Sequence, residues 1–417
     1  MTDQRKLKKL VRDRMARTGE TYTTARMHVL ARREITLPSG LFAGYRTFGA
    51  QRHRQSSLIA HVLEAQGVTY SEAMIAGLAG GIGFMYAVFE YKDIPPLMTI
   101  VAQHHPAPWA PEALGRLNVS YVEQHSGKAA AGIDKLRKAN RPALVSVDRS
   151  RLPWHGLEPG FGMDPYVIAV AGISGDTVYV DDSGLYEMST EDFGAAWSGY
   201  KKGRHHALII GEAGSPDLPR AIRSALKMTA GHLTGPVLGN SFDVNFGFSG
   251  MARLAAQLRD TRTKSGWAKR FGSPIAFAHG VRRFYECLEL EYTSPGATRP
   301  VYADFLDEAA PLVNPKLSDA ASLFRQSGAR WSALASLALE SVAGLGYADL
   351  VEERMAITFS RGRDAEPEIR ALNKRIEAVA AEYGDPLGDQ GRQDLFAAMA
   401  DIVDECVALE QEALRLF

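Results

Sequence analysis

The spacing of apolar residues changes along the chain, and each spacing predicts a different kind of element. Residues 3–17 and 56–67 carry apolar side chains three and four positions apart, which predicts amphipathic helices. We expect Ser56 or Ser57 to cap the second of these helices. Ser71 is the expected cap of a further helix, which runs into a glycine-rich segment that cannot stay helical.

Segments rich in β-branched residues follow and predict strands. The two middle segments are joined by Ser174-Gly175, a dipeptide typical of a tight hairpin. Helices followed by an antiparallel sheet predict an α+β domain over residues 35–214. The four expected strands are residues 142–148, 165–173, 176–182 and 205–211.

The rest of the chain predicts helices, so we expect three parts: an N-terminal arm (1–34), the α+β domain (35–214) and an α-helical domain (215–417). The arm is rich in lysine and arginine around one apolar stripe. One interpretation is a docking element for an acidic partner or a nucleic acid. The favoured alternative is a solvated face whose stripe packs on the body of the protein or on a second subunit, as in a homodimer.

Composition narrows the class of protein. The 417 residues are 46% hydrophobic, and 48 lysines and arginines balance 48 aspartates and glutamates. This balance argues against a dedicated nucleic-acid-binding protein. Two cysteines exclude a disulfide framework and suit a reducing cytosol. No apolar run is long enough to span a membrane, so we expect a cytoplasmic protein without a membrane partner.

The glycine-rich segment at residues 67–83 carries the most specific motif. It lacks the Gly-Lys-Ser/Thr ending of a phosphate-binding loop, and no expected strand precedes it. The whole run resembles the N-terminal domain of the butirosin biosynthesis protein H family, and the later helical segments resemble the helical domain that commonly follows it. The matching residues are Gly67, Ser71, Glu72, Met74, Gly77, Leu78, Gly80, Gly81 and Gly83.

The resemblance implies a papain-like fold with a Cys-His-Asp set that moves an acyl group from a carrier-protein thioester to an amine. His53 is kept, but Arg54 stands where the family carries its cysteine. Asp164 or Pro165 stands where the family carries its histidine, and Asp181 or Asp182 matches the third member. A covalent thioester route is therefore disfavoured.

Two functions remain open for this altered site. The first is an acyl or aminoacyl transferase that speeds aminolysis by orientation, with Asp164 as the base and Arg54 holding a phosphate or carboxylate. The second is a catalytically degenerate binding protein for a peptide, a carrier protein or a small metabolite, in which Arg54 and Asp164 pair with each other. The expected catalytic residues are His53, Arg54, Asp164 and Asp182, and the expected substrate-binding residues are Gln55, Ser56, Gly80, Gly81, Trp154 and His155.

Several of these residues also have a plain structural interpretation. Ser56 and Ser57 are either substitute nucleophiles or helix caps, and Trp154 either stacks on a ligand or closes the edge of the core. Histidines occur at 104–105, 155 and 205–206. Adjacent residues on a strand point to opposite faces, so His205 and His206 cannot readily bind one metal ion together. We therefore expect no metal and no cofactor. The expected partners are a small-molecule amine and an acyl or peptidyl carrier protein.

Overall fold

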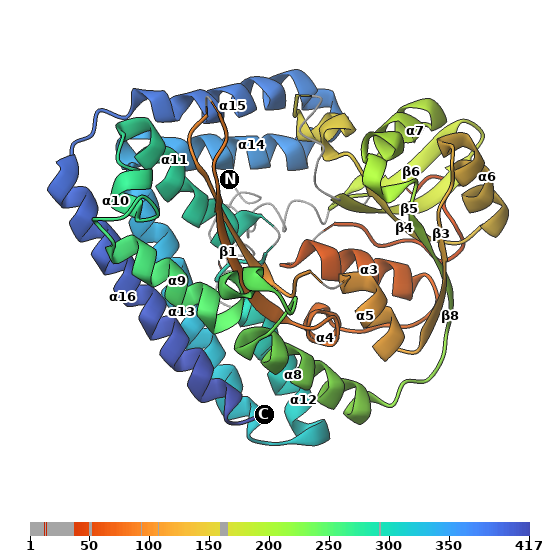
Figure 1. The fold of residues 1–417 in the computed structure, drawn as a ribbon. Coiled ribbons are helices and arrows are strands. Elements are labelled where there is room, and N and C mark those ends of the chain that lie inside the picture. The colour runs from red at the N-terminus through yellow and green to blue at the C-terminus, as the bar shows by residue number, and fades with distance from the viewer. Residues whose placement is uncertain are drawn as a thin grey trace. The chain divides into compact units, whose positions relative to one another are not determined.

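The structure is a computed structural model, which divides the chain into two compact units (Figure 1). The sheet unit comprises the described residues up to Tyr70 together with Asn118–Gly214 and Asp349–Glu377. The helical unit comprises Ser71–Leu117, Ser215–Ala348 and Ala378–Phe417. The structure describes residues 12, 14, 37–49, 52–92, 94–106, 108–158, 166–291 and 293–417.

The sheet unit is built on a six-stranded antiparallel sheet with the strand order β3-β8-β4-β5-β6-β7. Its central strand β5 (Tyr166–Ser174) is buried along most of its length. The other strands are β3 (Val119–Gln124), β4 (Ala143–Val147), β6 (Thr177–Asp181), β7 (Leu185–Ser189) and β8 (Ala207–Ala213). The helices are α3 (Arg54–Glu64), α6 (Ala129–Ala139), α7 (Thr190–Gly199), most of α14 (Tyr347–Arg361) and α15 (Glu366–Ala378).

Helices cover both faces of this sheet. Figure 1 shows α6 and α7 on one side of the strands and α3 on the other. Apolar side chains of β4, β5 and β6 form one core with those of α6 and α7, around the buried Trp197. Successive side chains of a strand point to opposite faces. Alternate residues of β5 therefore point toward α6 and α7 on one face of the sheet and toward α3 on the other. Strand β5 is the element that holds the layers of this unit together.

The helical unit contains one two-stranded hairpin, β1 (Ile82–Phe89) with β2 (Leu97–Gln103), among its described elements. Its longest helices are α13 (Leu317–Glu340) and α16 (Gly388–Leu414). The remaining α-helices are α4 (Glu72–Leu78), α5 (Trp109–Arg116), α8 (Leu218–Thr234), α9 (Gly247–Arg259), α10 (Trp267–Arg270), α11 (Pro274–Tyr285) and α12 (Arg299–Val313).

A fully buried ion pair ties these helices together. Glu410 of α16 accepts hydrogen bonds from Arg299 of α12, at 2.8 and 3.0 Å, and from Ser327 and Trp331 of α13. The Arg299 guanidinium also donates to the carbonyl oxygens of Gly83 and Ala102 in the hairpin. A buried charge is tolerated only when its partners are supplied in this way. One pair thus connects three helices and the hairpin.

The expected fold class is confirmed: an α+β part with an antiparallel sheet comes first, and the described residues after β8 form helices but no strands. The four expected strands correspond to β4, β5, β6 and β8, and the hairpin at Gly175 is present. Strands β1, β2, β3 and β7 were not expected. The expected domain boundaries stay a prediction, and nearly all of the N-terminal arm lies outside the described residues.

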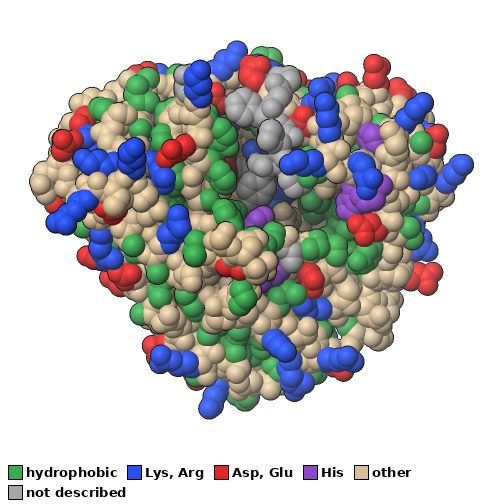
Figure 2. All heavy atoms as spheres, viewed as in Figure 1, with side chains coloured by type: hydrophobic (Ala, Val, Ile, Leu, Met, Phe, Trp, Pro, Cys, Tyr) green, Lys and Arg blue, Asp and Glu red, His purple; other side chains and the backbone are tan. Residues whose placement is uncertain are grey.

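The surface carries mixed charge. Figure 2 shows basic and acidic side chains interspersed over the visible face, with histidines gathered in a few places. No helix among the described residues has the length and apolar character needed to cross a membrane.

Two helical glycines of the helical unit give a matched test of its packing. A Cβ atom added at Gly77 in α4 would lie 2.0 Å from the Phe305 ring of α12, whereas one added at Gly231 in α8 would meet nothing within 4 Å. We expect Gly77→Ala to lower the free energy of unfolding by about 1–3 kcal/mol through overpacking. Gly231→Ala should raise it by about 0.4–1 kcal/mol. Urea denaturation followed by circular dichroism measures both, and equal stability of the two variants would contradict the packing described.

Candidate functional site

The candidate site starts at the first turn of α3. The N-cap of this helix is His53, and its Nδ1 lies 2.8 Å from the Ser56 hydroxyl and 3.4 Å from the Ser56 amide. Ser57 donates its hydroxyl to the His53 carbonyl oxygen inside the first turn. The expectation that Ser56 or Ser57 caps the helix is wrong, because the helix begins at Arg54. Both serines are buried within it.

A single buried carboxylate organises the site. Asp182 follows the last residue of β6, and its side chain is 1% exposed. Its Oδ1 accepts from Arg54 Nε at 2.8 Å and from the Tyr166 hydroxyl at 2.9 Å. Its Oδ2 accepts from Trp154 Nε1 and lies 2.8 Å from His155 Nε2. Four partners match the four acceptor positions of a carboxylate, so the hydrogen bonding of Asp182 is saturated.

The start of α3 and the start of β5 lie in contact. The Arg54 guanidinium stacks over the Tyr166 ring, with Cζ 4.0 Å from the ring centre, and it also donates to the Val167 carbonyl oxygen. An arginine over an aromatic face gains a cation–π attraction that adds to its ion pair. The side chain of Arg54 is 23% exposed. Arg54 therefore links α3, β5 and the residue after β6, with part of its side chain at the surface of the unit.

The surroundings of Asp182 keep it ionised. Burial alone would raise the pKa of this carboxyl, but the positive charge of Arg54 and the hydrogen bonds from His155 and Trp154 outweigh burial. The pKa of Asp182 therefore falls well below its ordinary value. The negative charge of the site is permanent across the physiological pH range.

His155 is held in one tautomer. Asp182 is ionised and accepts, so the proton of the imidazole must lie on Nε2 and the lone pair of the neutral ring on Nδ1. Burial lowers the pKa of His155, against the raising effect of Asp182. The neutral form therefore predominates at pH 7. A neutral imidazole oriented by a carboxylate is the arrangement of a general base.

Residues far along the chain support the loop that carries His155. Asn373 of α15 donates its amide to the carbonyl oxygens of His155 and Gly156, at 2.9 Å each. Gly156 has a φ of +57° and passes close to α15, where an added Cβ would lie 2.7 Å from Ile369. The backbone position of His155 thus depends on a close approach that only glycine permits.

A second buried carboxylate lies next to the first in sequence. Asp181 Oδ2 lies 2.6 Å from His61 Nδ1 and accepts from the Tyr45 hydroxyl at 2.9 Å. Burial raises the pKa of Asp181 even though these partners lower it. Adjacent aspartates therefore have pKa values shifted in opposite directions. This second cluster anchors α3 to β6 on the other face of the strand.

The other predicted site residues fall in different places. Ser56 is hydrogen-bonded to His53, and Gln55 is half-buried in the first turn of α3. Gly80 and Gly81 belong to the helical unit, where they pass against the rings of His104 and Tyr302; an added Cβ would lie 2.7 and 2.2 Å from them. Asp164, the expected base, lies outside the described residues.

Neither cysteine belongs to this cluster. Cys287 and Cys406 are both buried in the helical unit. Burial raises the pKa of the Cys287 thiol to about 11, and it also raises that of Cys406. A raised pKa disfavours the thiolate, which is the nucleophilic form. The described residues around Asp182 therefore combine an imidazole, a carboxylate and a guanidinium without a thiol.

Sequence reasoning missed Tyr166 and Asn373. Tyr166 directly follows the Asp164-Pro165 pair that was singled out, and its position at the start of a strand was the available signal. Asn373 lies in a segment whose helical periodicity says nothing about which part of the chain it contacts.

Comparison with known proteins finds two family models that match successive parts of the chain. Residues 53–183 match the model described as butirosin biosynthesis protein H, N-terminal. Residues 196–357 match a domain of unknown function (DUF4872). The first match contains the whole Asp182 cluster, since Arg54, Trp154, His155 and Tyr166 all lie within it. No curated protein gives a significant match to the chain.

The pKa of Asp182 makes a prediction about stability against pH. A carboxyl whose pKa is lower in the folded state stabilises the protein above its unfolded pKa of about 3.9, and this contribution is lost as the pH falls further. We expect Asp182→Asn to lower the free energy of unfolding at pH 7 by about 3 kcal/mol, the lower end for a broken buried pair, because Arg54 is partly exposed. Below about pH 4 the difference from wild type should shrink.

Urea denaturation at a series of pH values between neutral and acid measures this effect. Asp134→Asn is the matched control, because that carboxylate is 63% exposed and pairs only with Arg137 among the ion pairs described. It should change stability by no more than about 0.5 kcal/mol. A pH-independent difference between Asp182→Asn and wild type would contradict the depressed pKa.

Proposed function

Because the chain has a butirosin biosynthesis protein H N-terminal domain followed by a DUF4872 domain, we propose that it acts in specialised-metabolite biosynthesis as an acyl or aminoacyl transferase without a cysteine nucleophile. In this proposal the donor is a thioester on a carrier protein and the acceptor is a small-molecule amine, and the reaction takes place in the cytoplasm. The sheet unit is proposed to be papain-like.

The observation that supports transfer best is the His155–Asp182 pair. In a papain-like site a carboxylate orients an imidazole, and the imidazole serves a thiol. In our proposal His155 supplies the oriented imidazole, from a position earlier in the chain than the one where the resemblance places the family's histidine, and Arg54 stands where the resemblance places the thiol. The proposed site thus has a group that can accept and return a proton, and among its described residues it has no thiol that could form a covalent acyl adduct.

A thioester is activated enough for direct attack by an amine. The new C–N bond forms at the thioester carbonyl carbon, the C–S bond breaks, and the carrier thiol leaves. His155 Nδ1 takes the proton that the attacking nitrogen releases and returns it to the departing sulfur. A positioned base of this kind contributes about 10²–10⁴-fold, and orientation of the two reactants supplies the rest.

Arg54 is proposed to bind the donor. Its guanidinium carries a permanent positive charge on a side chain that is 23% exposed. A phosphate or carboxylate group of the substrate is the chemistry that a guanidinium recognises best. The ion pair with Asp182 fixes the plane of the guanidinium, so its orientation is set before the substrate arrives.

The second candidate is binding without turnover, and one observation favours it. All acceptor positions of Asp182 are occupied, and Arg54 already has an anionic partner. A cluster satisfied in this way also suits a purely structural role that keeps a binding surface in shape. The two candidates differ in whether the chemistry of His155 matters.

We expect His155→Gln to lower the rate of amide formation by about 10²–10⁴-fold, because glutamine can still donate to Asp182 but has no basic nitrogen. The assay incubates the full chain with aminoacyl and acyl thioesters of a carrier protein and a panel of amines, and detects the amide product by mass spectrometry. Asp164→Asn, tested in parallel, shows whether the base favoured from the sequence contributes instead.

Cys406→Ala serves as the control, since a thiol-independent reaction should proceed at the wild-type rate in this variant. A His155→Gln variant that retains full activity would exclude His155 as the base. If wild type gives no product over the whole panel and yet binds a carrier protein or an amine, the binding function replaces the transferase.

A further inference from the structure

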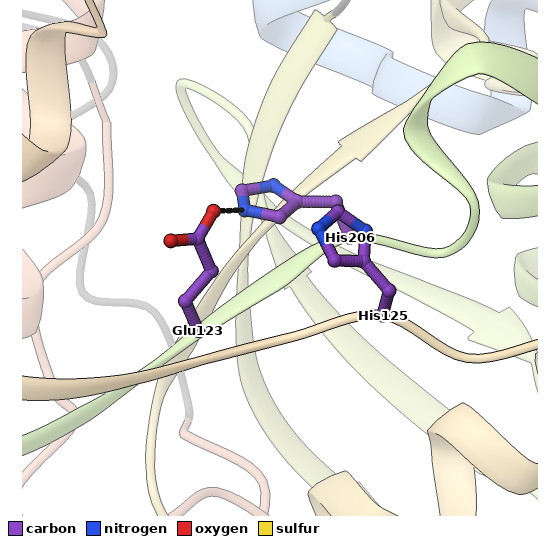
Figure 3. Close-up of side chains that lie close together, drawn as sticks. All are labelled: Glu123, His125 and His206. Carbon is purple, nitrogen blue, oxygen red and sulfur yellow. Dashed lines mark hydrogen bonds and ion pairs between the residues drawn. The ribbon is translucent and has the colours of Figure 1, made fainter.

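A second group of histidines lies at the edge of the sheet unit, among residues that the proposed transfer reaction does not use. Glu123, His125 and His206 come together where β3 ends and β8 begins (Figure 3). One ligand atom of each residue lies within 4.8 Å of the others. His206 Nε2 lies 2.8 Å from Glu123 Oε1, and the rings of His125 and His206 are 5.0 Å apart.

The register of the two strands explains this grouping. Glu123 pairs with Leu208 and Gln124 with Ala207, so continuing the antiparallel register places His125 opposite His206. Residues two apart on one strand point to the same face, which puts Glu123 beside both rings. The hydrogen bond from Ser126 N to the Arg204 carbonyl oxygen extends the pairing past the histidines. Backbone hydrogen bonds between the two strands therefore hold the segments that carry the three side chains.

The tautomer of His125 is fixed in a form that suits metal binding. Its Nδ1 lies 3.1 Å from the Gly203 carbonyl oxygen, which can only accept, so Nδ1 carries the proton and the lone pair of the neutral ring lies on Nε2. Metal-binding histidines almost always donate their other ring nitrogen to a carbonyl or carboxylate in this manner. His125 thus already makes the hydrogen bond that the other ring nitrogen of a metal-binding histidine usually makes.

We propose that Glu123, His125 and His206 form a binding site for a divalent transition-metal ion of the zinc type. Two imidazole nitrogens and one carboxylate oxygen are a ligand set of zinc sites, and three protein ligands leave a further position for water. Imidazole ligands favour zinc, cobalt or nickel over magnesium and calcium, which prefer oxygen ligands. Binding of the ion through His206 Nε2 replaces the hydrogen bond to Glu123, and the proton of the neutral ring then lies on Nδ1.

An ion bound at this site would connect the edge strand of the sheet to its neighbour. Strand β3 is the terminal strand and pairs with β8 alone in the six-stranded sheet. Two ligands belong to the end of β3 and one to the start of β8, so a bound ion fastens the edge strand to its neighbour. Metal binding is therefore expected to stabilise the folded protein by mass action.

The neighbouring histidine offers a matched control. His205 belongs to a different set of contacts, with its Nδ1 2.7 Å from the Ser126 carbonyl oxygen and its Nε2 3.0 Å from the Ser198 hydroxyl. Its φ is +52°, a conformation that asparagine tolerates better than most residues. His205→Asn therefore removes an imidazole next to His206 without touching the three ligands.

Titration of the untagged, chelator-treated chain with zinc chloride in a calorimeter tests the proposal, with cobalt absorption as a second readout of the ligand set. We expect one ion per chain, a rise in Tm with zinc, and at least about tenfold weaker binding in Glu123→Gln, His125→Ala and His206→Ala. His205→Asn should bind zinc like wild type, and circular dichroism checks that every variant is folded. Zinc binding that persists at full strength in a folded His125→Ala, His206→Ala double variant would overturn the proposal, and so would equal loss in His205→Asn.

Discussion

The sheet unit depends on one buried negative charge. Asp182 is almost inaccessible to water, so its carboxylate must find all of its hydrogen bonds inside the protein. It finds them on the first residue of α3, on the loop before β5 and on the start of β5 itself. The requirement to satisfy this carboxylate fixes where these segments lie, and it also fixes the orientation of the imidazole and the guanidinium.

The guanidinium that stands where the family resemblance places a thiol fits this requirement. A cysteine at the start of α3 would leave one acceptor position of Asp182 for another donor, whereas Arg54 fills it and adds a full positive charge. The pair holds Asp182 ionised and so keeps the proton of His155 on Nε2. Arg54 therefore sets the charge state of Asp182 and, through it, the tautomer of His155. The proposed reaction depends on that control, because it forms no covalent adduct with the protein.

Much of the fold could be predicted from local patterns, but the partners within the site could not. Segments rich in β-branched residues located β4, β5, β6 and β8, and the motif around Ser71 located its helix cap. One alternative paired Arg54 with Asp164, just before β5, and the structure brings Arg54 onto Tyr166 at the start of that strand. The choice of Asp182 over Asp181, and the contribution of His155, depend on which face of a strand each side chain occupies and on contacts between distant segments. The glycines at 80 and 81 were linked to a ligand, whereas they make room for the His104 and Tyr302 rings.

The sheet unit is not one continuous stretch of chain. The polypeptide leaves it at Gly214 and returns at Asp349, and the returning segment supplies Asn373 to the loop of His155. A fragment that ends between the two family matches would leave the carbonyl oxygens of His155 and Gly156 without this donor. Recombination or truncation at the apparent domain junction would therefore separate the His155 loop from the amide that supports its backbone.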